Sequence, residues 1–196
     1  LEDILMSDDT LFMINALKKL GVSIKFLETN RLLIKGTNGI FKPKNKETTI
    51  YLGNSGTSVR FLTAMISICL LPNYNIVITG NSYMQKRPIG DLTKVLKKLN
   101  INIKHMDSDN NYLPITISKN HNWNCNDNII NINGDKSSQY ISAILMSSIF
   151  FKKKISICTS NNSVSKGFIN LTIKIMKIFG ANITIDKTPN YIFYYI

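Results

Sequence analysis

Long hydrophobic runs are absent from this 196-residue sequence. The nearest approach to one, Phe61 to Leu71, is much shorter than the roughly 20 apolar residues that a membrane-spanning helix needs. No basic and apolar leader of the secretory type opens the chain. We therefore expect a cytoplasmic protein that has no membrane partner.

Cysteine and histidine are also scarce, with three and two residues. Because Cys69, Cys125 and Cys158 are odd in number and far apart, they indicate neither a disulfide framework nor a zinc site, and we expect buried free thiols. His105 and His121 lie in strand-end or loop contexts and are interpreted as ordinary polar surface. A Ser/His/Asp arrangement is not visible, so nothing in the sequence indicates a hydrolase triad.

Acidic residues number 12 against 24 basic residues, which gives a formal net charge of +12. This charge is compatible with nucleic acid, an anionic membrane or small phosphorylated metabolites, and it selects none of them. The lysines are spread along the chain in pieces such as KPKNK and FKKK, without the interleaved aromatic residues of a single-strand binder. The main interpretation is a solvated basic surface, and we expect no nucleic-acid partner.

An internal repeat of about eighty residues is the most informative feature of the sequence. Three segments align, SDDTLFMINALKKLGV, KRPIGDLTKVLKKLNI and SKGFINLTIKIMKIFGA, and each has the spacing of an amphipathic helix. Each predicted helix ends at a residue that tolerates a left-handed turn, namely Gly21, Asn100 or Gly180. In the third helix, the predicted inward face consists of Thr172, Ile175, Met176 and Phe179.

A complete unit reads strand, helix, strand, helix, strand, strand. Its first helix, Ser58–Leu70 or Ser138–Phe150, is apolar on most sides, as a helix in the centre of a domain should be. The sequence predicts one α/β domain, 1–196, with pseudo-threefold symmetry, in which parallel buried helices are surrounded by sheets. The expected repeat units are 1–40, 41–119 and 120–196, and the first of them is partial because the chain opens midway through the pattern.

Small polar residues gather where the predicted helices begin, as in LGNSGTSVRFL. The symmetry places these helix starts on one common surface, and free amides, hydroxyls and a guanidinium there suit an anionic ligand. From the stretch LGNSGTSVRFL alone, helix capping is the favoured explanation of the same hydroxyls. Arg60 is either part of this site or a structural ion-pair partner, and Pro88 is expected in the first turn of its helix. The candidate residues are Asn54, Gly56, Thr57, Arg87, Ser137, Ser138, Gln139 and Ser165.

Taken together, five motifs in order resemble the 5-enolpyruvylshikimate-3-phosphate (EPSP) synthase family: SDDTLFMINALKKLGV, YLGNSGTSVRFLTA, MQKRPIGDL, GDKSSQYISAILM and SKGFINLTIKIMKIFGA. They look most like the version in fungal pentafunctional arom polypeptides. The resemblance implies a fold of two domains, each with three βαβαββ units. This chain would be most of the N-terminal, shikimate-3-phosphate domain of that enolpyruvyl transferase fold.

The resemblance also implies the reaction, that of a 3-phosphoshikimate 1-carboxyvinyltransferase in aromatic amino acid biosynthesis. The 5-hydroxyl of shikimate 3-phosphate adds to C2 of phosphoenolpyruvate as C3 is protonated, and the adduct then eliminates phosphate, without metal or organic cofactor. The family's catalytic residues would lie outside this chain, partly in a second domain, so the chain should bind substrate without turning it over. By resemblance, Ser137, Ser138, Gln139 and Ser165 would bind shikimate 3-phosphate, Gly56 and Arg87 would bind phosphoenolpyruvate, and Asn54 and Thr57 would shape the loop where the inhibitor glyphosate competes.

One departure from the family pattern is Phe168, where members usually have Tyr. The missing hydroxyl would cost about 1–3 kcal/mol if a phosphate oxygen were left unpaired. A non-catalytic remnant of the family is therefore one alternative. A second is the enolpyruvyl transferase acting on UDP-N-acetylglucosamine, which usually has a reactive cysteine shortly before its Arg-Pro motif, whereas GNSYMQKRP has none. A basic RNA-binding module related to RNA phosphate cyclases is a third.

Overall fold

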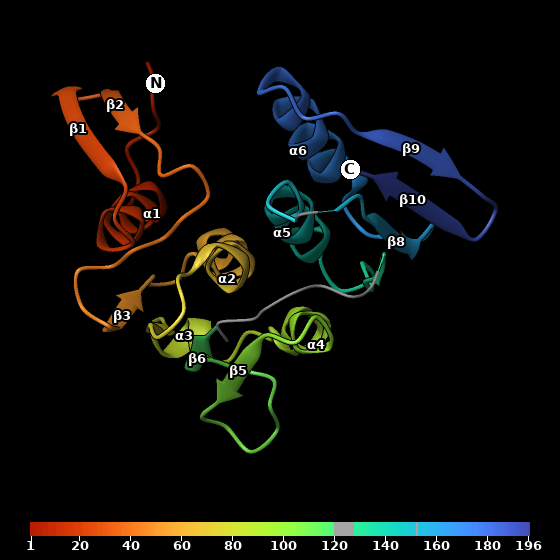
Figure 1. The fold of residues 1–196 in the computed structure, drawn as a ribbon, viewed down its shortest axis with the longest axis horizontal. Helices are drawn as coiled ribbons and strands as arrows, with labels where there is room; N and C mark the ends of the chain where they lie inside the picture. The colour runs from red at the N-terminus through yellow and green to blue at the C-terminus, as the bar shows by residue number, and fades with distance from the viewer. Residues whose placement is uncertain (120–127, 152) are drawn as a thin grey trace.

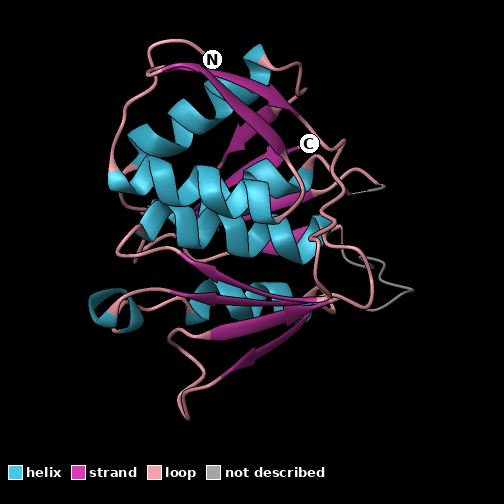
Figure 2. Ribbon diagram, turned by 90° about the vertical axis from the view of Figure 1, so that its left-hand side faces the viewer, coloured by secondary structure: helices cyan, strands magenta, loops and turns pink. Residues whose placement is uncertain are grey.

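Two long helices occupy the centre of the fold in the computed structural model, which describes residues 1–119, 128–151 and 153–196. They are α2 (Gly56–Cys69) and α5 (Ser138–Ser148), and they pack against each other. Most of their residues are buried because they are apolar on most sides. The three sheets lie around this pair (Figure 1), and Figure 2 shows helices packed side by side between layers of strands.

The two four-stranded sheets have the same topology, with orders β3-β4-β6-β5 and β7-β8-β10-β9. In each, the first two strands are parallel and the other neighbours are antiparallel. The α/β fold class and the βαβαββ order expected from the repeat are therefore confirmed, whereas the residue boundaries of the units stay a prediction. The unit that contains α2 also contains β3 (Glu47–Tyr51), β4 (Asn75–Thr79), α3 (Ser82–Gln85), α4 (Gly90–Lys98), β5 (Asn102–His105) and β6 (Ile115–Ser118). The unit that contains α5 also contains β7 (Ile129–Asn131), β8 (Ser156–Ser160), α6 (Lys166–Ile178), β9 (Thr184–Lys187) and β10 (Tyr191–Tyr195).

The N-terminal part contributes a shorter set, α1 (Asp8–Lys19), β1 (Ser23–Glu28) and β2 (Arg31–Lys35). Ser7 caps α1 by accepting a hydrogen bond from the amide of Thr10. Strands β1 and β2 form an antiparallel two-stranded sheet. By its place in the order of elements, β2 corresponds to β6 and β10, each of which lies between two neighbours, whereas among the described residues β2 pairs with β1 alone. Leu33 and Ile34 of β2 are exposed.

The predicted helix ends are confirmed by the backbone. Gly21, Asn100 and Gly180 follow α1, α4 and α6 closely, and their φ angles are 98°, 61° and 91°. Helix α2 begins at Gly56, two residues earlier than the sequence indicated, and this places Gly56 and Thr57 in its first turn. Pro88 precedes α4 instead of lying in its first turn, because α4 begins at Gly90.

The predicted inward face of α6 is wrong for Ile175 and Phe179, which are exposed, whereas Met176 is buried and Thr172 is half-buried and bonds Ser142 of α5. The buried residues are Ile169, Ile173 and Met176, and Phe179 is 82% exposed. Apolar residues occupy more than one side of this helix, so the helical spacing fits two different faces equally well.

The scarce residue types are placed as follows. Cys69 and Cys158 are buried free thiols, as expected. His105 is not surface: its side chain is fully buried and bonds the Thr93 hydroxyl and the Tyr112 carbonyl, both at 2.9 Å. Cys125 and His121 lie outside the described residues. No helix of the described ranges is long and apolar enough to cross a membrane.

Candidate functional site

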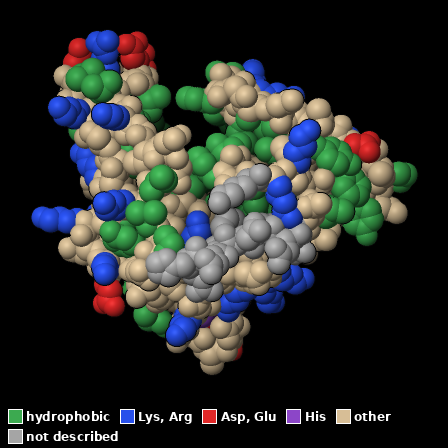
Figure 3. Space-filling view, in the orientation of Figure 1, with side chains coloured by type: hydrophobic (Ala, Val, Ile, Leu, Met, Phe, Trp, Pro, Cys, Tyr) green, Lys and Arg blue, Asp and Glu red, His purple; other side chains and the backbone are tan. Residues whose placement is uncertain are grey.

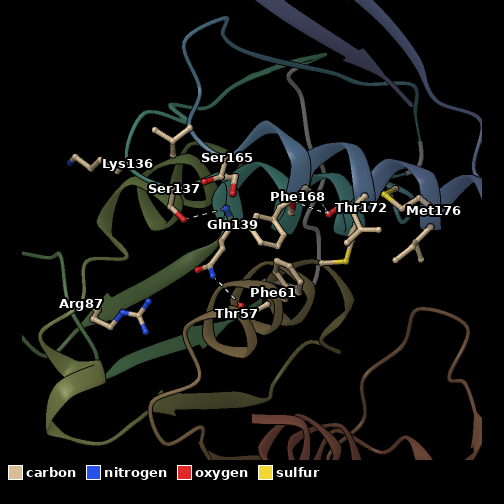
Figure 4. Close-up of a pocket in the computed structure, with 16 residues that line it drawn as sticks. Thr57, Phe61, Arg87, Lys136, Ser137, Gln139, Ser165, Phe168, Thr172 and Met176 are labelled. Atoms are coloured by element: carbon tan, nitrogen blue, oxygen red, sulfur yellow. Dashed lines mark hydrogen bonds between the residues drawn. The ribbon is translucent and has the colours of Figure 1, made fainter. Parts of the chain in front are cut away.

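The N-termini of α2, α5 and α6 converge on one side of the molecule, as the repeat predicted for the first two. The clearest contact between them is a hydrogen bond of 3.0 Å from the Gln139 side-chain amide to the Thr57 hydroxyl, which joins residues 82 positions apart. Figure 4 shows Gln139 reaching from α5 toward Thr57 at the start of α2. Free amides and the positive ends of three helix dipoles are thereby brought to a common place.

A cavity of about 520 Å³ lies at this convergence. Its two cationic lining residues are Arg87 and Lys136, and no acidic residue is found among the lining residues that the structure describes. This combination of cations, hydroxyls and helix N-termini attracts anions. The lining consists of Thr57, Phe61, Arg87, Lys136, Ser137, Ser138, Gln139, Ser142, Met146, Val164, Ser165, Phe168, Leu171, Thr172, Ile175 and Met176.

The Arg87 guanidinium lies directly beside the first turn of α2. A Cβ atom built on Gly56 would stand 2.7 Å from both terminal nitrogens of Arg87, so the absence of a side chain at Gly56 gives the guanidinium its place. Arg87 donates a long hydrogen bond of 3.4 Å to the Asn54 carbonyl. The structure thus brings Asn54, Gly56 and Arg87 to the cavity edge, although only Arg87 lines it.

The serines at the helix starts differ in what they already bind. The Ser137 hydroxyl caps α5 by accepting from the amide of Gln139 at 3.2 Å, and Ser138 is buried in the first turn. Ser165 precedes α6 in the left-handed conformation, with φ 53° and ψ 43°, and its hydroxyl does not cap that helix. Non-glycine residues adopt this conformation rarely, and such positions gather at functional sites. The Ser165 hydroxyl is therefore available to a ligand.

Lys136 adds a cation that reasoning from the sequence did not single out. Its ammonium forms an ion pair of 2.9 Å with Asp91, in the first turn of α4, and this partner raises the pKa of Lys136. The pair joins the loop before α5 to the helix that follows Arg87. Lys136 lies within the GDKSSQ motif, directly before three candidate residues, and this position in the sequence could have identified it as a further candidate.

Arg60 is buried below the cavity instead of forming an ion pair with a carboxylate. Its guanidinium donates to the carbonyl of Gly56 at 3.1 Å and to the carbonyl of Pro88 at 2.8 Å. Burial lowers its pKa, and the nearby positive charge of Arg87 acts in the same direction. The sequence suggested a ligand or a carboxylate as the partner of Arg60, whereas its two shortest hydrogen bonds go to backbone carbonyls.

The remaining cavity wall is mainly apolar and extends between α2, α5 and α6. Ser142 and Phe61 lie four residues after Ser138 and Thr57, so helical spacing from the predicted residues could have identified them. Thr172 donates to the Ser142 hydroxyl at 2.9 Å across α5 and α6. Phe168 lines the cavity and is 67% exposed.

Basic side chains are not concentrated in one patch on the face that Figure 3 displays. Figure 3 shows Lys and Arg side chains scattered over the face that it displays, in agreement with their spread along the sequence. Among the described residues, no group of three or more His, Cys, Asp and Glu side chains could hold a metal ion.

Comparisons with known proteins identify the family of the chain. Residues 1–195 match the family described as EPSP synthase (3-phosphoshikimate 1-carboxyvinyltransferase). The chain is 35% identical to the 3-phosphoshikimate 1-carboxyvinyltransferase of Neisseria gonorrhoeae, with 93% of this chain and 40% of that protein covered. It is equally 35% identical to the pentafunctional AROM polypeptide of Pneumocystis carinii, with 99% of this chain and 12% of that protein covered.

Solved structures show the same fold. EPSP synthase from Acinetobacter baumannii superposes with a TM-score of 0.74 at 24% identity, covering 96% of this chain and 39% of that one. The chain thus spans about two fifths of the length of the bacterial relatives that it matches. Because the bacterial and the AROM proteins are equally similar in sequence, identity does not separate a single-function polypeptide from a multifunctional one.

Proposed function

The chain belongs to the EPSP synthase family, and on that premise we propose that the polypeptide containing it is a 3-phosphoshikimate 1-carboxyvinyltransferase. It would transfer the enolpyruvyl group of phosphoenolpyruvate to the 5-hydroxyl of shikimate 3-phosphate and release phosphate. Both substrates are small and highly anionic. The proposal places the enzyme in the cytoplasm and gives it no nucleic-acid or membrane partner.

The observation that carries this proposal is the cavity where three helices begin beside Arg87. Two crowded anions need cationic and hydrogen-bond donor groups that are fixed in advance, because reorganising such groups during the reaction costs free energy. Helix N-termini supply amide donors without reorganisation, and acidic side chains are absent from the described lining.

The donors divide into two groups that match two substrates. Ser137, Ser138 and Ser165 stand at the starts of α5 and α6, and we assign them to shikimate 3-phosphate. Gly56 and Arg87 stand together at the start of α2, and we assign them to phosphoenolpyruvate. Asn54 supports this second group, because its carbonyl accepts from Arg87.

Gln139 lies between the two groups. Its side chain donates to Thr57 in the first turn of α2 and its own backbone belongs to α5, so it can contact both substrates. Phe168 lines the same cavity as the serines of the first group, and it offers no hydroxyl. The proton-transfer groups and the remaining cations would come from the rest of the polypeptide, so this chain by itself should bind substrate and not catalyse transfer.

The experiment that tests the proposal is a titration of the 196-residue chain with shikimate 3-phosphate, followed by amide NMR. A dispersed spectrum first establishes that the sample is folded. Saturable shifts at Ser137, Ser138, Gln139 and Ser165 are expected, with shikimate as the control ligand that lacks the phosphate. A folded sample whose spectrum does not respond to shikimate 3-phosphate would contradict the proposal.

A further inference from the structure

Arg60 is a buried cation for which the proposed chemistry assigns no contact with substrate. It is 3% exposed and lies in α2, four residues after Gly56. Charged side chains are almost never buried to this extent unless they are paired, because desolvation of the charge is costly. Its terminal nitrogens donate to two backbone carbonyls and the Met84 sulfur, its guanidinium also interacts with the Tyr140 hydroxyl, and its Nε has no hydrogen-bond partner among the described residues.

The two carbonyls belong to the segments that hold the proposed phosphoenolpyruvate ligands. One terminal nitrogen of Arg60 donates to Gly56, the first residue of α2, at 3.1 Å. The other donates at 2.8 Å to Pro88, the residue that follows Arg87. A single rigid guanidinium therefore sets the distance between Gly56 and the backbone that carries Arg87.

A second side chain, that of Tyr140, donates a hydrogen bond to the Pro88 carbonyl. The Tyr140 hydroxyl donates to the Pro88 carbonyl at 2.9 Å, so this oxygen accepts two hydrogen bonds, one from α2 and one from α5. Burial raises the pKa of Tyr140, which keeps the phenol protonated as a donor. Tyr140 follows Gln139 directly in the chain, so α2 and α5, whose first turns carry proposed substrate ligands, are both hydrogen-bonded to the Pro88 carbonyl.

Arg87 contrasts with Arg60 in how its donors are used. Its described contacts are the 3.4 Å bond to the Asn54 carbonyl and a 4.0 Å contact with the Met84 sulfur. The same sulfur lies 3.6 Å from Arg60. One arginine is anchored by short bonds to the backbone, and its neighbour keeps most of its donors for an anion.

Resting on the proposed function, we propose that Arg60 is a positioning residue for the phosphoenolpyruvate part of the site, with Tyr140 as its partner at the Pro88 carbonyl. Stability alone does not explain a guanidinium at this position, since an apolar residue of similar volume would avoid the desolvation. The geometry explains it, because an apolar residue would leave Gly56 and Arg87 without a common anchor.

The test uses the full-length enzyme with Arg60→Met, Arg60→Lys and Tyr140→Phe, assayed for enolpyruvyl transfer with each substrate varied. Arg60→Met should raise KM for phosphoenolpyruvate about tenfold or more, because misplacing a ligand by about 1 Å has effects of this size. KM for shikimate 3-phosphate should change much less. Arg60→Lys should restore part of the loss, and Tyr140→Phe should have a smaller effect that is not additive with Arg60→Met.

Ile66→Val is the matched control, since Ile66 is fully buried in the same helix and does not line the cavity. It should lower the melting temperature without changing either KM. An unchanged KM for phosphoenolpyruvate in Arg60→Met, or an equal rise of both KM values, would overturn the inference.

A crystal structure of Arg60→Met gives a result that does not depend on turnover. Displacement of the Arg87 guanidinium from the Asn54 carbonyl supports the positioning role, and an unmoved Arg87 refutes it. If instead the wild-type enzyme fails to transfer the enolpyruvyl group, the proposed function is wrong, and the position of Arg87 in the variant still decides the inference.

Discussion

Replacing Gly56 by Ala should separate ligand binding from folding in this site. The terminal nitrogens of Arg87 lie 2.7 Å from the position of the added Cβ, whereas ordinary contacts begin at 3.4 Å, so the guanidinium must move by about 0.7 Å. The end of a flexible, exposed side chain can make this movement at low cost. The three atoms nearest to the added Cβ all belong to Arg87, and Gly56 lies in the first turn of α2, where Ala is the better helix former by up to about 1 kcal/mol.

The displaced guanidinium should lose much of one charge-assisted hydrogen bond to the ligand. Such a bond contributes about 1.5–3 kcal/mol, which corresponds to a rise of about 10- to 150-fold in KM for phosphoenolpyruvate. Steady-state kinetics of the full-length enzyme measure this rise, and thermal unfolding measures stability. We expect the melting temperature to stay equal to that of the wild type or to increase slightly.

Gly167→Ala is the control for this prediction. Gly167 lies at the second position of α6, and a Cβ built there meets nothing within 4 Å. The Gly167→Ala substitution should change neither the KM for phosphoenolpyruvate nor the KM for shikimate 3-phosphate. If Gly56→Ala leaves KM for phosphoenolpyruvate within about twofold of wild type, a difference of about 0.4 kcal/mol, then Arg87 does not hold that substrate from its observed position.

Three further predictions concern other parts of the molecule. Phe168→Tyr should lower KM for shikimate 3-phosphate by about 2- to 12-fold, because one neutral hydrogen bond adds about 0.5–1.5 kcal/mol; an unchanged value in the same assay would show that the hydroxyl does not reach the phosphate. Thr57→Val removes the acceptor of the Gln139 amide and should raise both KM values, whereas Thr57→Ser should not; a normal Thr57→Val enzyme would contradict a shared role for Gln139. Burial raises the pKa of the Cys69 thiol to about 12. The buried neutral thiol therefore makes its full contribution to the free energy of unfolding at pH values below 9.0, the ordinary pKa of the group, and this contribution decreases as the pH rises toward 12. Iodoacetamide at pH 8 should therefore spare Cys69 in the folded chain and modify it after unfolding, as read by peptide mass spectrometry, and rapid labelling of the folded chain would refute its burial.

The convergence of the helix starts could be predicted from the sequence because the repeat imposes it. Once two similar units pack their apolar helices side by side, the residues around Gly56 and Ser138 must share one surface. Thr57 and Gln139 are far apart in the sequence, yet their contact follows from the symmetry and not from any local pattern.

The role of Arg60 could not be predicted in the same way. Its two shortest hydrogen bonds go to backbone carbonyls, and every residue has a carbonyl, so no residue type in the sequence marks Pro88 as an acceptor. His105 shows the same limit, since its burial depends on the Tyr112 carbonyl and the Thr93 hydroxyl. The face of α6 was mistaken for a different reason, because a helix that is apolar on more than one side does not specify which side is covered.

The two-stranded sheet of β1 and β2 has a consequence for handling the isolated chain. Leu1 bonds the backbone of Leu32 at the outer edge of β2, no further described strand pairs with that edge, and Leu33 and Ile34 on this strand are exposed. An open edge with aliphatic side chains is a template onto which another extended chain can add. We therefore expect the purified 196-residue chain to self-associate with rising concentration, and a lysine in place of Leu33 to keep it monomeric in analytical ultracentrifugation.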